Sequence, residues 1–291
     1  MVYLLLFLLG LCVGSFLNVV IDRLSREESL GGRSYCENCQ KSLAWFELLP
    51  VLSWFWLRGK CRRCKSNISF YYPLVELLTG LLFSVGIFLS FPRGFSLSFP
   101  SVITVLYLLV IISVLTAVFF TDLKYGVIPD QLILIGVFST VAYRLLLIIE
   151  RIGGTYLKLK NDVNGLGPYL LRTDYLALHL RSELVDLLVF FLSGLILAFI
   201  FWLIVKLTRE KGMGTGDVTL GFLIGLISGF PGVVVSVFLG FLFGSIVSIL
   251  LIILRRKRFG QTVPLGPFLI IALLITLFFG DSLIKWYINL L

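Results

Sequence analysis

The chain has 291 residues, of which 58% are hydrophobic and only 14% are charged. A soluble domain needs far more polar cover for its outer surface, so this composition excludes a water-soluble globular protein. The net charge of +9 would suit a nucleic-acid partner, but membrane topology explains the positions of the basic residues better, and we expect contact with membrane lipid and not with nucleic acid.

Apolar runs recur along the chain and predict an all-α polytopic membrane protein with about eight transmembrane helices. The first run has neither a basic start nor a small-residue cleavage site, so we expect a retained helix and no cleaved signal peptide. The sixth is short, because its 14 residues span about 21 Å as a helix against a hydrocarbon core of about 30 Å. It is expected to be tilted, partly buried or re-entrant, with a tight turn at Pro231 and Gly232. The segments are 2–21, 74–92, 101–121, 128–149, 184–206, 217–230, 232–254 and 266–284.

Lysine and arginine residues predict the orientation of these helices, because they accumulate in cytoplasmic loops. With eight spans, the loops on one side carry 17 basic residues, nine of them in residues 22–73, whereas the loops on the other side carry six. We therefore expect the first side to be cytoplasmic and both termini to face outward. Residues 150–183 then form a long outward loop, which is polar enough to be solvated.

The polar block at residues 22–73 contains two CxxC pairs, "CENC" and "CRRC". Two such turns can close a tetrahedral four-cysteine zinc site without an open position, so we expect structural zinc on Cys36, Cys39, Cys61 and Cys64. Four ordinary thiols are the alternative. The only histidine, His179, lies in the outward loop, which argues against a Cys–His enzyme. The aromatic residues of this block are expected to pack a small zinc-ribbon core and rest it on the membrane, or to bind a substrate segment.

Two aspartates end or begin apolar segments on the predicted cytoplasmic side, Asp122 after the third and Asp217 before the sixth. Ionisable residues in such positions are candidates for function. Two neighbouring carboxylates share a proton and can act as acid and base on water, which suffices for aspartic proteolysis without a metal. Gly214 and Gly216 leave the backbone beside Asp217 bare, so that an extended substrate chain can approach. The alternative is that Asp217 only favours the helix dipole as an N-terminal residue.

Taken together, six ordered motifs resemble the type IV prepilin peptidase family, also called leader peptidase/N-methyltransferase, over nearly the whole chain. They are "GSFLNVVIDRL" (14–24), the two CxxC pairs, "ISFYYPLVELLTG" (68–80), "DLKYGVIPD" (122–130), "GTGD" (214–217) and "PLGPFL" (264–269).

This resemblance implies a bacterial inner-membrane enzyme with eight transmembrane helices and Asp122 and Asp217 as its catalytic pair. It implies cleavage of the short basic leader of prepilins or pseudopilins at the cytoplasmic face. It also implies methylation of the new amino terminus from S-adenosylmethionine. The expected parts are a first helix (1–21), a four-cysteine insertion assigned to methyl transfer (22–73), and a peptidase domain (74–291).

The chain departs from the family's pattern at Thr219, where members often carry a lysine that would bias the charge of the dyad. No Rossmann-type glycine fingerprint marks a site for S-adenosylmethionine. Glu76 is a candidate for orienting the amine there, and it is equally a candidate for a purely structural hydrogen bond.

Two other functions use the same aspartates. A presenilin-like intramembrane protease shares GxGD, but its other aspartate typically follows a tyrosine, whereas Thr121 precedes Asp122 here, and such enzymes lack a CxxC insertion. An ion-coupled transporter often shows internal repeats, and none is convincing in this sequence.

Overall fold

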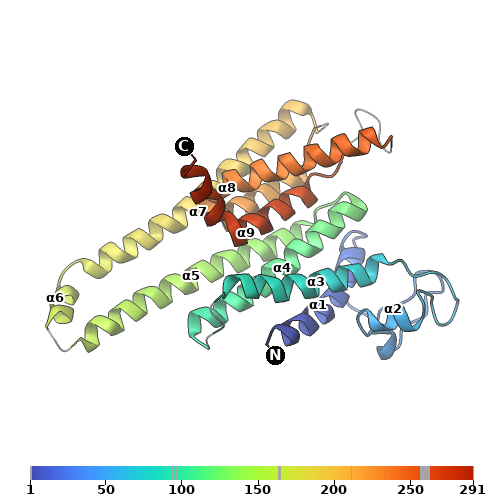
Figure 1. Cartoon of the computed structure of the whole chain (residues 1–291), viewed down its shortest axis with the longest axis horizontal. Helices are drawn as coiled ribbons and strands as arrows, with labels where there is room; N and C mark the ends of the chain where they lie inside the picture. Colours follow the sequence, from blue (N-terminus) through green and yellow to red (C-terminus); the bar gives the residue numbers. More distant parts are fainter. Residues whose placement is uncertain are drawn as a thin grey trace. The chain divides into compact units, whose positions relative to one another are not determined.

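The protein is almost entirely helical in a computed structural model, which describes residues 2–92, 95, 97–162, 165–210, 212–255 and 263–290 (Figure 1). Within these ranges the only β-type pairing is two isolated bridges, Tyr35 with Ser42 and Lys60 with Asn67. The helices are α1 (Val2–Leu24), the 3₁₀ helix η1 (Trp45–Leu48), α2 (Leu52–Trp56), α3 (Tyr71–Ser90), α4 (Phe99–Tyr125), α5 (Asp130–Asn161), α6 (Leu166–Arg172), α7 (Tyr175–Thr208), α8 (Thr215–Ile253) and α9 (Gly266–Ile288).

Seven of these helices, α1, α3, α4, α5, α7, α8 and α9, are long and apolar enough to cross a membrane. The predicted sixth and seventh segments both fall within α8, whose backbone leaves helical geometry at Gly229 and Phe230. The break therefore comes just before the turn expected at Pro231 and Gly232. Gly229 has a positive φ of 59°, and a Cβ there would strike the ring of Phe190, so both backbone and packing favour glycine. The predicted all-α membrane fold is confirmed, with two of the eight segments joined in one broken helix.

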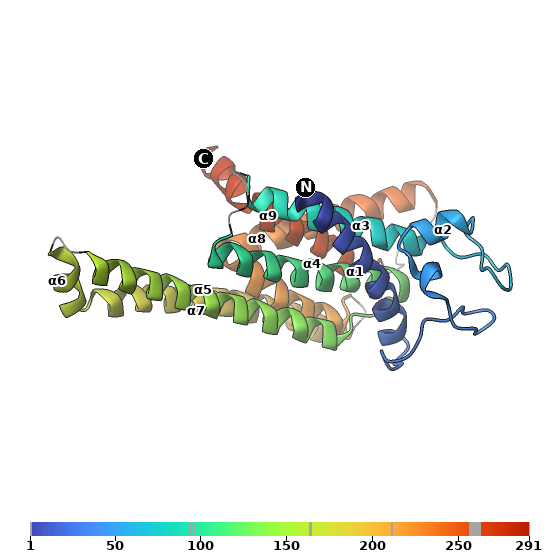
Figure 2. The ribbon, with the colours of Figure 1, turned by 90° about the horizontal axis from the view of Figure 1, so that it is seen from below.

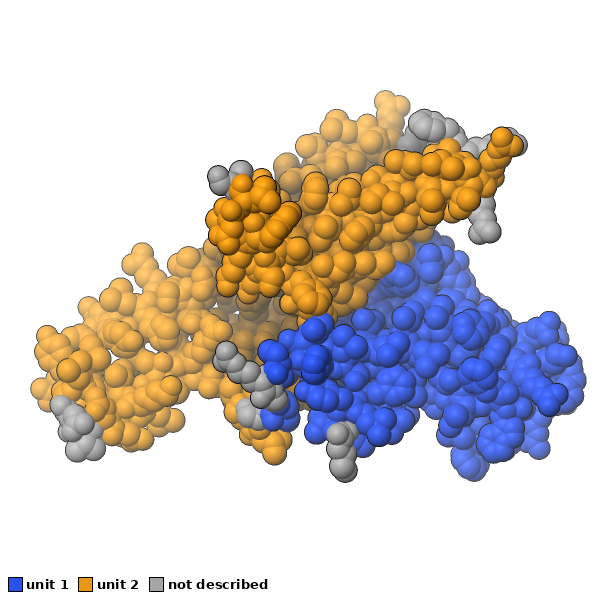
Figure 3. Space-filling model, viewed as in Figure 1, with its two compact units in different colours: residues 1–95, 108–132 blue, residues 96–107, 133–291 orange. Residues whose placement is uncertain are grey.

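The helices divide into two compact units, coloured separately in Figure 3. Unit 1 comprises residues 1–95 and 108–132, and so contains α1, the cysteine block, α3 and the end of α4. Its helices α1 and α3 pack closely because small residues face each other: a Cβ on Gly10 would lie 2.7 Å from the Cα of Gly80. Asn18 of α1 also donates to the carbonyl of Tyr72 at 3.1 Å. Of the polar block predicted at residues 22–73, the first three residues belong to α1 and the last three to α3. The residues between these helices, 25–70, are called the insertion below.

Unit 2 comprises residues 96–107 and 133–291. Its centre is α8, against which α7 and α9 both pack. Glycines again allow the close approach, since a Cβ on Gly240 of α8 would lie 2.6 Å from the side chain of Leu269 on α9.

The long loop expected over residues 150–183 is mostly helical in the described part of the chain, whereas its solvation and outward placement remain predictions. α5 continues to Asn161, α6 follows, and α7 already begins at Tyr175 (Figure 2). Each residue added to an existing helix gains a hydrogen bond without a new nucleation cost, so a helix readily continues past its apolar part. Arg151 of α5 and Glu183 of α7 form an ion pair of 3.0 Å that joins the two extensions.

Several basic residues that entered the orientation argument lie outside the described residues: Arg93, Lys211 and Arg256, Lys257 and Arg258. The cytoplasmic placement of the insertion and the outward placement of both termini remain predictions from the sequence.

Candidate functional site

The two CxxC turns of the insertion have the same backbone geometry. In each, the first cysteine's N–H donates to a carbonyl five residues on, Cys36 to Lys41 at 3.1 Å and Cys61 to Ser66 at 2.8 Å. In each, the residue four positions on donates back to that cysteine's carbonyl, Gln40 at 2.7 Å and Lys65 at 3.0 Å. Both of these residues have positive φ. Each turn is thus a closed loop that holds both of its sulfurs on one side.

The four sulfurs of Cys36, Cys39, Cys61 and Cys64 all lie within 4.8 Å of one another, and none is in a disulfide. The Sγ atoms of Cys36 and Cys64 are 3.8 Å apart. Four sulfurs bound to one zinc ion at about 2.3 Å lie about 3.8 Å from each other, so the cluster fits a tetrahedral metal. Hydrogen bonds from the hydroxyl and then the amide of Ser66 lower the pKa of Cys64 to about 6, which favours the thiolate that a metal needs. The predicted grouping of the four cysteines agrees with this geometry.

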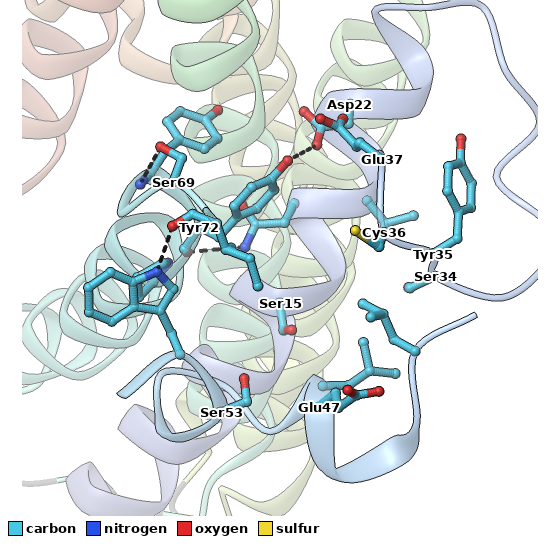
Figure 4. Close-up of a pocket in the computed structure, with 18 of the residues that line it drawn as sticks. Ser15, Asp22, Ser34, Tyr35, Cys36, Glu37, Glu47, Ser53, Ser69 and Tyr72 are labelled. Carbon is cyan, nitrogen blue, oxygen red and sulfur yellow. Dashed lines mark hydrogen bonds between the residues drawn. The ribbon is translucent and has the colours of Figure 1, made fainter. Parts of the chain in front are cut away.

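A pocket of about 880 Å³ lies in unit 1, between α1, the insertion and the start of α3 (Figure 4). Ser15 and Asp22 line it from α1, Tyr72 and Glu76 from α3, and Cys36 from the insertion. Its volume lies within the range of about 300–1,000 Å³ usual for small-molecule sites. We call it the insertion pocket.

Five carboxylates and four basic side chains line the insertion pocket. Of its basic residues, Arg23 donates to the carbonyls of Leu30, Gly31 and Arg33, and Arg62 lies over the ring of Phe46. Arg26 forms an ion pair of 2.6 Å with Glu37, which raises the pKa of Arg26, and Lys124 forms one with Asp22. Three lining carboxylates have no ion pair with a described residue: Glu28, Glu47 and Glu76. These three carboxylates could face a cationic group of a ligand, although the lining as a whole is nearly balanced in charge.

Glu76, the weak sequence candidate, has both a structural contact and a place in this pocket. It is buried on α3, and its Oε2 accepts a hydrogen bond of 2.6 Å from the N–H of Val51, which has a positive φ of 63°. This bond ties the insertion to α3. The structure thus supports the structural alternative directly, and the carboxyl group of Glu76 also lines the pocket.

Asp22, at the end of α1, accepts hydrogen bonds from side chains of α3 and α4. Its Oδ1 accepts from Lys124 Nζ at 2.6 Å and from the Tyr125 hydroxyl at 2.9 Å, and its Oδ2 accepts from the Tyr72 hydroxyl at 3.0 Å (Figure 4). The Lys124 ammonium also lies 4.8, 5.4 and 5.0 Å from the ring centroids of Tyr71, Tyr72 and Tyr125. We call these five residues the Asp22 cluster. Sequence reasoning missed it, although an aspartate directly after an apolar segment was a signal for it.

Asp122 lies one turn from the end of α4 in unit 1, and its side chain is buried. The two residues before it are buried as well, Phe120 and Thr121. The hydroxyl of Tyr71 on α3 donates to the carbonyl of Phe120 at 3.5 Å, and the two rings meet edge to face. The backbone around Asp122 is therefore held before it by Tyr71 and after it by the bonds of Asp22 to Lys124 and Tyr125.

Asp217 lies in unit 2, in the first turn of α8, and is also buried. Its Oδ2 accepts a hydrogen bond of 3.1 Å from the N–H of Gly214, so it caps the helix as the structural alternative expected. A Cβ added to Gly214 would meet only that Oδ2, at 3.7 Å, so the glycine leaves open space beside the carboxylate. The hydroxyl of Thr219 donates to the carbonyl of Gly216 at 3.0 Å, so its hydrogen bond is to the backbone of its own helix.

Comparison with known protein families agrees with this arrangement. Residues 8–91 match the bacterial peptidase A24 N-terminal domain, and residues 109–249 match the type IV leader peptidase family. The first match contains every residue that lines the insertion pocket except Lys124, and the second contains both aspartates. The chain thus has the two parts of a bacterial membrane peptidase of this class.

Curated relatives extend over nearly the full length. A prepilin leader peptidase/N-methyltransferase of Aeromonas hydrophila is 33% identical over 98% of this chain and 93% of its own. Proteins of the same name from Pseudomonas aeruginosa and Bacillus subtilis are 29% and 27% identical, over 97% and 98% of this chain and 92% and 97% of their own. No solved structure gives a significant match. The chain belongs to the prepilin leader peptidase/N-methyltransferase family and is an enzyme.

Proposed function

We propose that this enzyme removes the leader peptide of prepilins or pseudopilins and then methylates the new amino terminus. The observation that carries the proposal is a buried carboxylate at the end of an apolar helix in each half of the matched peptidase region, Asp122 on α4 and Asp217 on α8. Both are candidates for catalysis, because a buried carboxylate at the membrane boundary is costly unless it is used.

In the proposed cleavage, Asp122 and Asp217 share one proton between them. The ionised carboxylate removes a proton from water while the water oxygen attacks the scissile carbonyl carbon. The protonated carboxylate donates its proton to the carbonyl oxygen, which gives a tetrahedral diol. The carboxyl group that took the water proton then passes it to the leaving nitrogen as the carbon–nitrogen bond breaks, and the other carboxylate takes a proton back from one hydroxyl of the diol, so that the pair again shares one proton. The open space beside Gly214 admits the substrate backbone to Asp217.

The sidedness of the reaction follows from the positive-inside rule, which favours a cytoplasmic insertion with both aspartates at the same face. A prepilin is itself anchored in the membrane with its basic leader in the cytoplasm, so the scissile bond would lie at that depth. We place the enzyme in the bacterial inner membrane on this ground.

For methyl transfer we propose the insertion pocket. S-adenosylmethionine supplies, when bound, a methyl group on a positively charged sulfur. The carboxylates of Glu28, Glu47 and Glu76, which have no ion pair with a described residue, could face such a cation, and the volume of the pocket suits a ligand of that size. Glu76 can accept the proton that the attacking amine releases as its nitrogen–carbon bond forms. Zinc on the four cysteines would hold the wall of the pocket in place, because four sulfur ligands leave no position for a reactant.

The test uses membranes that contain wild-type protein, Asp122→Asn or Asp217→Asn, incubated with a leader-bearing prepilin and S-adenosylmethionine. Asp130→Asn is the matched control, since Asp130 is exposed at the start of α5. Mass spectrometry reads leader loss and amino-terminal methylation separately. We expect each dyad variant to lose at least about 10²-fold in cleavage rate and to methylate a pre-cut pilin normally. Cleavage at the normal rate by either variant would refute the aspartyl mechanism.

A further inference from the structure

We propose that the Asp22 cluster is a positioning device for the peptidase carboxylate on α4, a role that rests on the proposed function of Asp122. The cluster joins three elements that are distant in sequence: the end of α1, the start of α3 and the end of α4. Its central ion pair connects Asp22 and Lys124, which are 102 residues apart. Lys124 comes two residues after Asp122 on the same helix.

The contacts bracket Asp122 on both sides. Before it, Tyr71 holds Phe120 through the ring contact and a hydrogen bond to its carbonyl. After it, Asp22 holds Lys124 and Tyr125 through two bonds of 2.6 and 2.9 Å. These anchors all come from α1 and α3, and they fix the rotation and height of the last turn of α4. The side chain of Asp122 therefore has a defined position relative to the insertion pocket.

This ion pair differs from an ordinary surface pair. Exposed pairs contribute little to stability, because water screens them and both side chains must be ordered. Here the side chains of Lys124 and Asp22 are only 30% and 15% exposed. The ammonium is surrounded by three tyrosine rings, and the carboxylate accepts two further hydroxyl hydrogen bonds. Removing one charge leaves the other partly buried without its counter-charge, so the turn must shift.

The arrangement also shows what Lys124, the basic residue nearest to Asp122 in sequence, contacts. The ammonium of Lys124 is already bound to Asp22 and lies against three tyrosine rings. We infer that Lys124 acts on the peptidase through the position of α4. A misplacement of about 1 Å in a catalytic group can cost on the order of 10²-fold in rate, so a positioning residue affects kcat strongly without touching substrate.

The experiment measures kcat and KM of prepilin cleavage for Asp22→Asn, Lys124→Met and the double variant in proteoliposomes. Glu183→Gln is the control, because it removes the charge from another interhelical ion pair, that with Arg151. We expect each single variant to lower kcat about tenfold or more with KM within about twofold. The double variant should be no slower than the slower single, since the two residues act as one unit. Lys124→Arg should restore most of the rate.

Amide hydrogen exchange over residues 118–126 gives a readout that does not depend on activity. Exchange should be faster in Lys124→Met than in wild type, and near normal in Lys124→Arg. The inference is overturned if either single variant keeps kcat within about twofold, if the two effects multiply in the double variant, or if exchange is unchanged in Lys124→Met. Asp122→Asn in the same series separates the two proposals. If it abolishes cleavage while Asp22→Asn does not, only the positioning role fails. If Asp122→Asn cleaves normally, the aspartyl function fails.

Discussion

Gly225 of α8 lies directly against Gly194 of α7: a Cβ added to Gly225 would stand 2.5 Å from the Cα of Gly194 and 2.6 Å from its nitrogen. Both neighbouring atoms belong to the backbone, so no side-chain rotation can make room. In a membrane, where apolar burial drives helix association weakly, such close backbone approach is a main source of stability.

Gly225→Ala should therefore destabilise the protein by about 1–3 kcal/mol, the usual cost of overpacking a tight interface. Thermal or denaturant unfolding in detergent measures this loss. Gly244→Ala on the same helix is the control, because its nearest neighbour would be 3.5 Å away, an ordinary contact. Equal stability of the two variants would contradict the close-packing account.

Metal content tests the cysteine cluster. Purified protein should contain about one zinc ion per chain, and a Cys36→Ser, Cys39→Ser double variant should lose it, because two sulfur ligands cannot close a tetrahedral site. Elemental analysis measures the zinc. Cys12→Ser is the control, since Cys12 lies on α1 outside the cluster. Full zinc in the double variant would end the four-cysteine proposal.

Gly214→Ala tests whether the substrate backbone needs the space beside Asp217, with little effect expected on folding. The backbone of Gly214 has a φ of −79°, which any residue adopts, and an added Cβ makes only an ordinary 3.7 Å contact with the Asp217 carboxylate. We expect stability within about 1 kcal/mol of wild type, the usual effect at an N-cap, and a clear fall in cleavage rate as the methyl group obstructs the substrate. Gly153→Ala, with nothing within 4 Å, is the control. Unimpaired cleavage by Gly214→Ala would show that the space is not used.

Two substitutions at Glu76 distinguish its charge from its structural bond. Glu76→Gln keeps an oxygen that can accept from the N–H of Val51 but loses the charge, whereas Glu76→Ala loses both. If the charge serves methyl transfer, Glu76→Gln should methylate a pre-cut pilin more slowly while cleaving prepilin normally. Glu76→Ala should in addition lower stability, by up to about 1–3 kcal/mol, because the partly buried N–H of Val51 loses its partner. Normal methylation by Glu76→Gln would leave Glu76 with the structural role alone.

Local patterns in the sequence predicted a large part of this structure. Apolar runs marked the spans, because membrane helices need about 20 apolar residues, and the CxxC spacing marked the cysteine cluster, because two turns suffice to build it. The extensions of α5 and α7 were missed, since a polar helix carries no hydropathy signal. The Asp22 cluster was missed for another reason: the position of Asp22 directly after an apolar segment marked one residue, but its partners depend on the side-by-side placement of α1, α3 and α4, which no local pattern encodes. The roles of Asp122 and Asp217 remain predictions.

The break in α8 explains a charged residue inside the membrane. A helical carbonyl at Ile227 would normally accept from the N–H four residues on, but that position is Pro231, which has no N–H. Arg144 of α5 supplies the missing donor: its Nη2 lies 3.2 Å from the carbonyl of Ile227, 83 residues away in sequence, and its guanidinium stacks on Phe190. In lipid, an unsatisfied carbonyl and an arginine without hydrogen bonds would each be costly, and here the carbonyl gains a donor and the guanidinium gains an acceptor for its Nη2. The proline and the arginine thus form a complementary pair. Replacing Arg144 alone leaves the carbonyl of Ile227 without a donor, and replacing Pro231 alone restores a backbone N–H that competes with Arg144 for that carbonyl.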